Sequence, residues 1–148
     1  MRPPELTQYI HERIPLAKAM GASVMVVEDD VVILQAPLEP NLNHRETVFG
    51  GSASALAILA SWALLHVRLR SEGIADRLVI QRNVMEYQHP ILGQFTARSM
   101  LERADAWKLF TDTLARRGKA RITVLAVLEY MGRTAGRFSG QFVALEKP

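Results

Sequence analysis

The sequence contains no cysteine, which excludes disulfides, thiolate–metal sites and catalysis by a cysteine nucleophile. It also lacks the apolar core of roughly 7–15 residues that marks a secretory signal, because the chain starts MRPPELTQYIHERIPLAKAM. Both absences fit a protein that works in the reducing cytoplasm. A chain of 148 residues is most simply one domain, so we expect a single domain over residues 1–148.

Signals for nucleic acid, nucleotides and metals are missing too. The net charge is only +3, and no long run of lysine and arginine is interleaved with aromatic residues, so binding to nucleic acid is not expected. Neither a P-loop nor a G-x-G-x-x-G motif is present, and the histidines lack metal-binding spacings such as H-E-x-x-H. These histidines are His11, His44, His66 and His89. We therefore expect no metal and no bound cofactor.

Charge is absent from residues 48–65, VFGGSASALAILASWALL, which is the most apolar segment of the chain. A segment of this length could span a membrane. Its glycines, serines and alanines, and the basic residues that directly follow it, favour instead a helix buried on all sides in a soluble core. We therefore expect no membrane association.

Hydrophobic spacing predicts a helix, two strands, a long helix and then mainly strands. Leu6, Ile10 and Ile14 form one stripe of an amphipathic helix over residues 4–19, which Pro15 should bend or end early. We expect strands at 22–28, 31–36, 77–87, 91–103, 119–130 and 136–146, the long helix at 51–70 and a short helix within 104–118. Because the strands cluster rather than alternate with helices, the pattern predicts an α+β fold with a largely antiparallel sheet wrapped around the long helix.

Two segments resemble a known family. The segment YQHPILG at residues 87–93 is similar to the Y-x-x-P-[IV]-x-G element of hot-dog thioesterases. The segment NLNHRETVFGGSASALAILASWALL at residues 41–65 resembles the N-x-N-x-x-x-T-x-F-G-G-S pattern of the YiiD C-terminal domain family. The segment KARITVLAVLEYMG at residues 119–132 also fits a later strand of that family. The resemblance covers nearly the whole chain and implies a hot-dog fold.

The resemblance also implies a homodimer, or a higher homo-oligomer, that acts on acyl thioesters carried by acyl carrier protein or coenzyme A. The family was long labelled thioesterase-like. Members are assigned as malonyl-acyl-carrier-protein decarboxylases, which are lyases that make acetyl thioester to start fatty-acid biosynthesis. Hydrolysis by a thioesterase, and binding of an acyl thioester without catalysis, are the alternatives.

Asn43 and Thr47 match the family motif and are the candidate catalytic residues. Both side chains are neutral hydrogen-bonding groups that could flank a thioester carbonyl. Asparagine and threonine are also common in turns and at helix caps, which is the structural alternative.

Gly50 and Gly51, with Phe49 and Ser52 beside them, are the candidate thioester-binding residues. The unpaired N–H groups at the start of a helix could form an oxyanion hole there, since glycine lets a carbonyl approach closely. The alternative is that the glycines only permit a tight turn into the helix, with Ser52 as a possible cap.

Carboxylates are missing where hydrolysis would use one. Many hot-dog thioesterases carry an aspartate or glutamate in the central helix, yet residues 52–65, SASALAILASWALL, contain none. Glu46 and Glu86 remain as acid–base candidates. Loss of CO2 from a malonyl thioester needs only N–H groups and neutral donors to stabilise the enolate, so the missing acid favours decarboxylation.

The sharpest basic cluster comprises Arg116, Arg117, Lys119 and Arg121. It could contact an acidic carrier protein or the phosphates of coenzyme A. The alternative is an ordinary solvated start of a strand.

Overall fold

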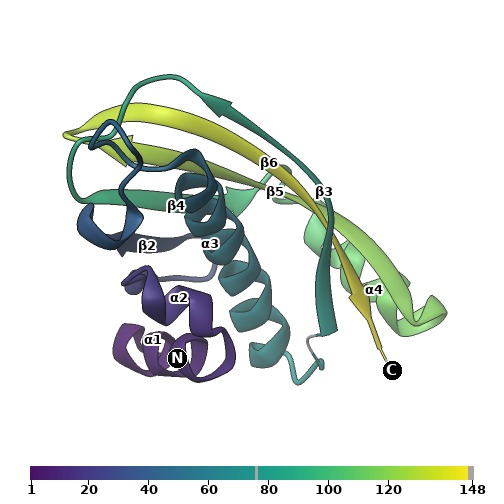
Figure 1. Ribbon diagram of the computed structural model, residues 1–148. Coiled ribbons are helices and arrows are strands. Elements are labelled where there is room, and N and C mark those ends of the chain that lie inside the picture. Colours follow the sequence, from purple (N-terminus) through teal and green to yellow (C-terminus); the bar gives the residue numbers. More distant parts are fainter. Residues whose placement is uncertain (76, 147–148) are drawn as a thin grey trace.

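One antiparallel sheet curves around the long helix α3 (Gly50–Ser71) in the computed structural model, which describes residues 1–75 and 77–146 (Figure 1). The strands of this sheet are β1 (Ser23–Val27), β2 (Val32–Ala36), β3 (Arg77–Tyr87), β4 (Phe95–Leu101), β5 (Lys119–Tyr130) and β6 (Arg133–Leu145). They lie in the order β1-β2-β4-β5-β6-β3, and each neighbouring pair is antiparallel. This is the hot-dog arrangement, and it confirms the predicted α+β fold.

Proline divides the amino-terminal helical segment in two. Helices α1 (Pro3–Arg13) and α2 (Pro15–Ala19) meet at Ile14, whose backbone leaves the helical region at φ −125° and ψ 89°. Pro15 has no N–H and clashes with the turn before it, so it starts a new helix instead of continuing the first. The predicted break at Pro15 is therefore confirmed.

Helix α3 is apolar on all sides because it forms the centre of the core. Its buried hydrophobic side chains are Ala53, Leu56, Ala57, Leu59, Ala60, Ala63, Leu64, Leu65 and Leu69. Small alanines allow close packing of the strands, and the leucines fill the remaining space. The helix is long and apolar enough to cross a membrane, but 61% of its most apolar stretch is buried inside the protein. This burial is what the central helix of a folded core requires.

Buried and more exposed side chains alternate along the strands, so that one face of the sheet packs against α3. On β5 every second side chain is buried, from Ala120 to Leu128, and the side chains between them are more exposed. This period of two is typical of a sheet with one face on the core. Strand β4 is shorter than the predicted 91–103, because the carbonyl of Ile91 accepts a hydrogen bond from the N–H of Val48 and so holds the loop before α3.

Helix α4 (Ala106–Arg117) follows β4 and lies at the far end of α3. Trp107 donates from Nε1 to the carboxylate of Glu72, and the guanidinium of Arg68 stacks 4.3 Å from the centre of the Trp107 ring. These contacts join α4 to the last turns of α3. The other end of α3 begins at Gly50 and follows the loop at residues 42–49.

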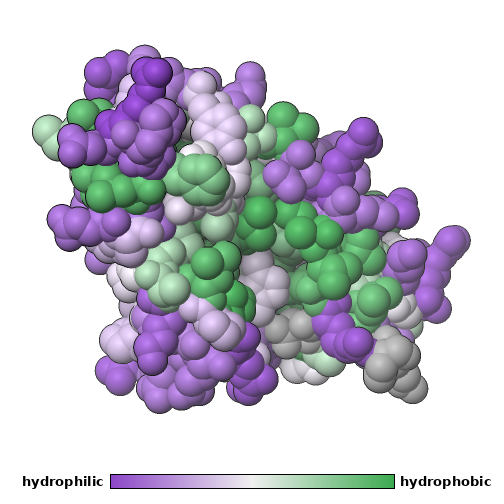
Figure 2. All heavy atoms as spheres, in the orientation of Figure 1, coloured by the Kyte–Doolittle hydropathy of each residue, from purple (hydrophilic) through white to green (hydrophobic). Residues whose placement is uncertain are grey.

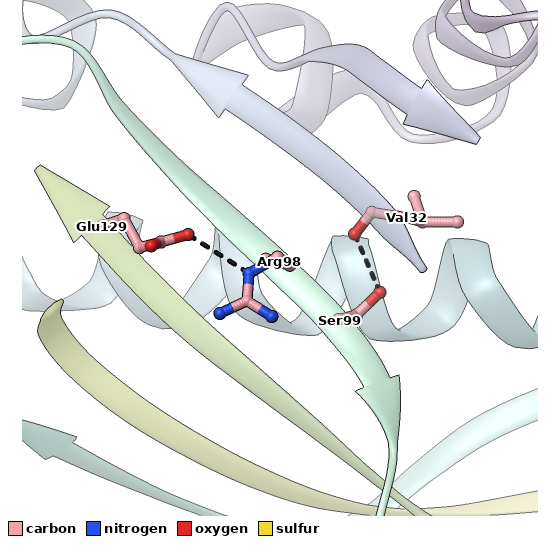
Figure 3. A network of polar contacts seen from close by, with 4 residues as sticks. All are labelled: Val32, Arg98, Ser99 and Glu129. Carbon is pink, nitrogen blue, oxygen red and sulfur yellow. Dashed lines mark hydrogen bonds and ion pairs between the residues drawn. The ribbon is translucent and has the colours of Figure 1, made fainter. Parts of the chain in front are cut away.

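Adjacent side chains on β4 serve opposite faces of the sheet (Figure 3). Ser99 points inward, where its hydroxyl lies 3.1 Å from the carbonyl oxygen of Val32 and 2.8 Å from that of Ala60 on α3. Arg98 points outward and contacts Glu129 on β5 at 3.3 Å. Ser99 therefore fixes the position of α3 along β2 and β4. Arg98 and Glu129 form a half-exposed ion pair on the outer surface of the sheet.

Candidate active site

The loop before α3 is closed by one asparagine. Asn43 donates from its backbone N–H to the carbonyl of Thr47, over 2.8 Å. Its side-chain oxygen accepts from the N–H of Arg45 at 2.8 Å and from the N–H of Thr47 at 3.1 Å. A short polar side chain that satisfies nearby backbone N–H groups is the usual way to hold a tight turn. These local hydrogen bonds of Asn43 therefore define the turn between residues 43 and 47.

The same asparagine orients the threonine hydroxyl. Asn43 donates from Nδ2 to Oγ1 of Thr47 over 2.8 Å. A hydroxyl has one proton and two acceptor positions, so Thr47 accepts this bond and keeps its own proton for another acceptor. The two predicted catalytic residues are thus brought together, with Thr47 as the available donor and Asn43 as the group that positions it.

A second asparagine anchors this loop to the rest of the protein. Asn41, at the end of the 3-10 turn Glu39–Asn41, is 2% exposed and donates from Nδ2 to the carbonyls of Met20 at 2.9 Å and Pro37 at 2.8 Å. Its backbone carbonyl accepts from the N–H of Phe49 at 2.8 Å. The N-cap residue of α3 is consequently held against the 3-10 turn.

Helix α3 starts without a side-chain cap. Phe49 is the residue at its N-cap, and no side-chain hydrogen bond caps the helix there. Ser52 lies inside the first turn and is not the cap that its residue type suggested. The helical hydrogen bonds begin at Ala53, whose N–H donates to the carbonyl of Phe49 over 3.1 Å. In an α-helix the N–H groups before that position have no intrahelical partner and carry partial positive charge, so they can receive a carbonyl oxygen.

A hollow of about 330 Å³ opens beside this helix start. It is lined by Thr47, Val48, Gly50, Ala53, Tyr87, Gln88, His89, Pro90, Ile91, Leu128 and Ala135. Thr47 and Gly50 come from the loop and the helix, and Tyr87 comes from the end of β3. No carboxylate is among these lining residues. The hollow thus combines neutral donors with apolar walls, which is a setting suited to stabilising a negative charge that develops on an oxygen.

Phe49 and Gly51 face a second hollow, of about 350 Å³, on the other side of the helix start. The ring of Phe49 lies over Gly51 so closely that a Cβ there would overlap it. Ser52 and Asn41 line the same hollow. A larger residue at position 51 would therefore have to displace the exposed Phe49 ring, whereas position 50 has room for an ordinary contact with Tyr87.

The acid candidates lie elsewhere. Glu46 is exposed at the tip of the loop, in a left-handed conformation with φ 64°, and does not line either hollow. Glu86 precedes Tyr87 on β3, and successive strand residues point to opposite faces. It lines a separate hollow on the outer face with Val84 and Arg137. The structure does not bring Glu86 to the hollow at Thr47.

The basic cluster lies at the opposite end of the sheet from this hollow. Lys119 pairs with Leu145 on β6, and Leu145 pairs with Arg77 at the start of β3. Tyr87 is the last residue of β3, so the strand rise of ~3.3 Å per residue separates the two ends by about 30 Å. Within one chain, the residues Arg116, Arg117, Lys119 and Arg121 therefore do not reach the hollow. Among the residues that the structure describes, no group of three or more metal-ligating side chains comes together either.

Comparison with known proteins gives the family. The family profile described as "Putative thioesterase (yiiD_Cterm)" matches residues 4–146. This chain belongs to that family. The YiiD C-terminal family assignment agrees with the motif at residues 41–65 and confirms the resemblance seen in the sequence.

Solved structures share the fold of this YiiD C-terminal domain. A protein of unknown function from Chlorobaculum tepidum is similar at 29% identity and a TM-score of 0.90, with 97% of this chain and 94% of that chain covered. A putative thioesterase from Shewanella oneidensis is similar at 22% identity and a TM-score of 0.84, with 96% of each chain covered. A probable thioesterase from Pseudomonas aeruginosa has 21% identity and a TM-score of 0.83, with 99% and 97% covered.

Three residues at or beside this hollow, Ser54, Tyr87 and His89, are not predicted as site residues by the sequence. Tyr87 and His89 stand out there only as letters of the YQHP element, and Ser54 only as part of an apolar helix. Simple alternation would not have identified Tyr87, because the register of β3 shifts between Ile80 and Arg82 and the inward-facing series changes phase before it reaches Tyr87. Ser54 carries no signal either, because its partner lies 33 positions away in the sequence.

Proposed function

We propose that this protein acts on acyl thioesters, and that its reaction is the decarboxylation of a malonyl thioester. The acetyl thioester that results would start fatty-acid synthesis, as expected of a malonyl-acyl-carrier-protein decarboxylase. Membership of a thioesterase-like family supports the substrate class. The observation that carries the reaction type is the hollow at the start of α3, which pairs neutral donors with a complete lack of carboxylates among its lining residues.

The chemistry follows from where charge develops. When the malonyl group loses CO2, the electron pair of the broken carbon–carbon bond moves into the thioester and forms an enolate, with negative charge on its oxygen. The free N–H group of Gly50 and the hydroxyl proton of Thr47, two residues that line this hollow, can stabilise that oxygen. Because the thioester itself accepts the electron pair, the reaction needs no cofactor. A carboxylate beside the enolate oxygen would repel the negative charge that develops there. A hollow lined without carboxylates therefore suits this reaction.

The decisive experiment gives the purified protein malonyl-acyl-carrier-protein and malonyl-coenzyme A and follows the carrier by mass spectrometry. Decarboxylation predicts an acetyl carrier, and the preferred substrate identifies the carrier. A free thiol carrier would show hydrolysis instead. An unchanged malonyl carrier, together with measurable binding, would show that the protein is a binding module.

Hydrolysis is a second candidate because His89 lines the same hollow as Thr47. A histidine is the commonest general base, and it could activate water against a thioester held at the helix start. His89→Gln separates the two reactions. Decarboxylation predicts that acetyl formation persists in this variant, whereas a His89-dependent hydrolase loses thiol release by about 100-fold or more. The matched control is His44→Gln, which changes an exposed histidine outside the lining residues.

We further propose that the protein is a homodimer in the cytoplasm, paired through β3. Among the described residues this strand lies at the edge of the sheet beside β6, and its Val79 and Val84 are 55% and 60% exposed. Next to it, an apolar groove of about 320 Å³ runs along α3 at Ile58 and Trp62, in the region between α3 and β3 where Figure 2 shows hydrophobic side chains at the surface. A long edge strand beside an apolar face is a template for pairing with a second chain.

Analytical ultracentrifugation tests this assembly. The expected species has twice the mass of one chain, and replacing both Val79 and Val84 by lysine should shift it toward the monomer because lysine blocks edge pairing. A wild-type protein that sediments as a monomer at high micromolar concentration would contradict the proposed dimer.

A further inference from the structure

Tyr87 joins the end of β3 to the first turn of α3. Its hydroxyl donates to the carbonyl of Gly50 over 3.2 Å and lies 2.8 Å from Oγ of Ser54. The Tyr87 side chain is otherwise open, with 60% of the residue exposed. A phenol is thus held in place at its oxygen while its surroundings remain accessible from the hollow.

The hydrogen bond from the Tyr87 hydroxyl proton to the Gly50 carbonyl is not needed to satisfy that carbonyl. The Gly50 carbonyl belongs to an α-helix, in which it accepts a hydrogen bond from the backbone N–H of Ser54, four residues later. The bond from Tyr87 is therefore an additional one, and removing it leaves no carbonyl without a donor. Ser54 can donate its own proton to the phenol oxygen, since either hydroxyl of this pair could be the donor. A phenol that accepts from Ser54 keeps its proton free for a stronger acceptor.

Tyr87 shares its hollow with the groups proposed to bind the thioester oxygen. Thr47, Gly50 and Tyr87 line this single space of about 330 Å³. If Thr47 and the helix N–H groups hold the enolate oxygen, the carbon that lost CO2 lies one bond further along in the same hollow. The proposed mechanism otherwise has no assigned source for the proton that this carbon must receive.

We propose that Tyr87 is a catalytic residue that protonates the enolate carbon, with Ser54 as the residue that positions its hydroxyl. The proposal rests on the proposed decarboxylation. After CO2 leaves, the enolate double bond attacks the hydroxyl proton of Tyr87, a new carbon–hydrogen bond forms, and the thioester carbonyl is restored. The oxygen–hydrogen bond of Tyr87 breaks and leaves a phenolate. Water then returns a proton to the exposed phenolate, so the net reaction consumes one solvent proton and releases CO2 and acetyl thioester.

The test follows the hydrogen that enters the product. Wild type, Tyr87→Phe and Ser54→Ala proteins convert malonyl-acyl-carrier-protein in an equal mixture of H2O and D2O, and mass spectrometry gives the deuterium content of the acetyl methyl group. In Tyr87→Phe, water must replace the phenol as donor, so the deuterium content is expected to change and the rate to fall by about 100-fold. Ser54→Ala keeps the phenol and should keep the wild-type deuterium content while turning over more slowly.

A matched control separates the role of the phenol from the general loss of a tyrosine hydroxyl. Tyr130→Phe removes the hydroxyl at the end of β5, outside the lining residues, and should leave both rate and deuterium content unchanged. A Tyr87→Phe protein with wild-type deuterium content overturns the proposal even if its rate falls, because Tyr87 would then only hold the helix in place. If the wild type releases no CO2 at all, the proposed function fails and this assignment fails with it.

Discussion

Asn43 donates to Oγ1 of Thr47 over 2.8 Å, while its own side-chain oxygen accepts the backbone N–H of the same threonine at 3.1 Å. One amide group therefore fixes both the backbone and the hydroxyl of Thr47. Because its amide nitrogen donates and its oxygen accepts, asparagine can do this without adding charge. The relationship assigns different tasks to two residues that the sequence suggested as equal partners.

Thr47→Val should separate the hydroxyl from the shape of the side chain. Valine has nearly the same volume but no donor, so kcat for CO2 release should fall by about 100-fold while the loop stays folded. Thr47→Ser keeps the donor and should retain most of the activity. Steady-state assays with malonyl-acyl-carrier-protein measure both variants. Equal turnover by the valine variant would show that the hydroxyl has no part in the reaction.

Asn43→Asp tests whether Asn43 acts by directing the proton of Thr47. The aspartate can still accept the N–H groups of Arg45 and Thr47, so the free energy of unfolding should change by less than about 1 kcal/mol. It cannot donate to Oγ1, and its carboxylate instead attracts the threonine proton away from the hollow. Turnover should therefore fall nearly as far as in Thr47→Val. Asn43→Ala is the comparison, because it also opens the turn and should lower stability by about 1–2 kcal/mol in chemical denaturation.

Two neighbouring glycines should respond differently to alanine. A Cβ at Gly50 would lie 3.4 Å from Cε1 of Tyr87, which is an ordinary contact, so Gly50→Ala should fold and keep Tyr87 in place. A Cβ at Gly51 overlaps the ring of Phe49, so Gly51→Ala should displace that ring and lower kcat/KM by up to about 100-fold through misplacement of the helix start. Adding Phe49→Ala removes the clash and should restore part of the loss. No recovery in the double variant would contradict the role given to the ring.

Glu46→Gly distinguishes backbone strain from acid–base chemistry. The left-handed conformation costs a non-glycine residue about 1–2 kcal/mol, and the added freedom of glycine in the unfolded chain costs about 0.4–1 kcal/mol. The difference predicts a net gain in stability of roughly 0.5 kcal/mol, without loss of turnover. Met131→Gly is the matched control, since Met131 has φ 53° in the β5–β6 turn and should gain a similar amount. Loss of activity only in Glu46→Gly would make Glu46 a catalytic candidate again.

Ser99→Ala should be more destabilising than Arg98→Ala, although the two residues are adjacent. Ser99 is fully buried and holds the carbonyls of Val32 and Ala60, so its loss should cost about 1–2 kcal/mol. Arg98 and Glu129 are more than a third exposed, and such a pair contributes less than about 1 kcal/mol. Denaturation with urea measures both. The reverse order would mean that the outer pair, not the inner hydroxyl, secures β4.

Much of the fold follows from local patterns in the chain. The predicted strands at residues 77–87 and 119–130 match β3 and β5, because both segments are rich in β-branched residues and β5 also alternates between buried and more exposed side chains. The break at Pro15 follows from the missing N–H. The strand expected to begin at 91 begins at Phe95 instead, since the carbonyl of Ile91 is taken by a loop that no local pattern reveals.

The candidate site was less predictable, because its contacts join distant segments. The family motif indicated Asn43 and Thr47, and their side-chain hydrogen bond is local enough to be anticipated. The meeting of Tyr87 with Gly50 and Ser54 depends on how β3 crosses the start of α3, which the sequence does not encode at any one position. Glu86 is the opposite case, since strand alternation alone is enough to place it on the other face of the sheet from Tyr87.

The order of strands also governs when the hollow can exist during synthesis. In the described part of the chain β3 pairs with β6 alone, and Tyr87 pairs with Gly136, almost fifty residues later in the chain. While the ribosome is still making the intervening residues, β3 has no partner and the apolar surface of α3 is uncovered on that side. Such delayed, non-local pairing slows folding and leaves a nascent chain prone to association. The wall of the hollow that carries Tyr87 therefore cannot form until the first residues of β6 have been made.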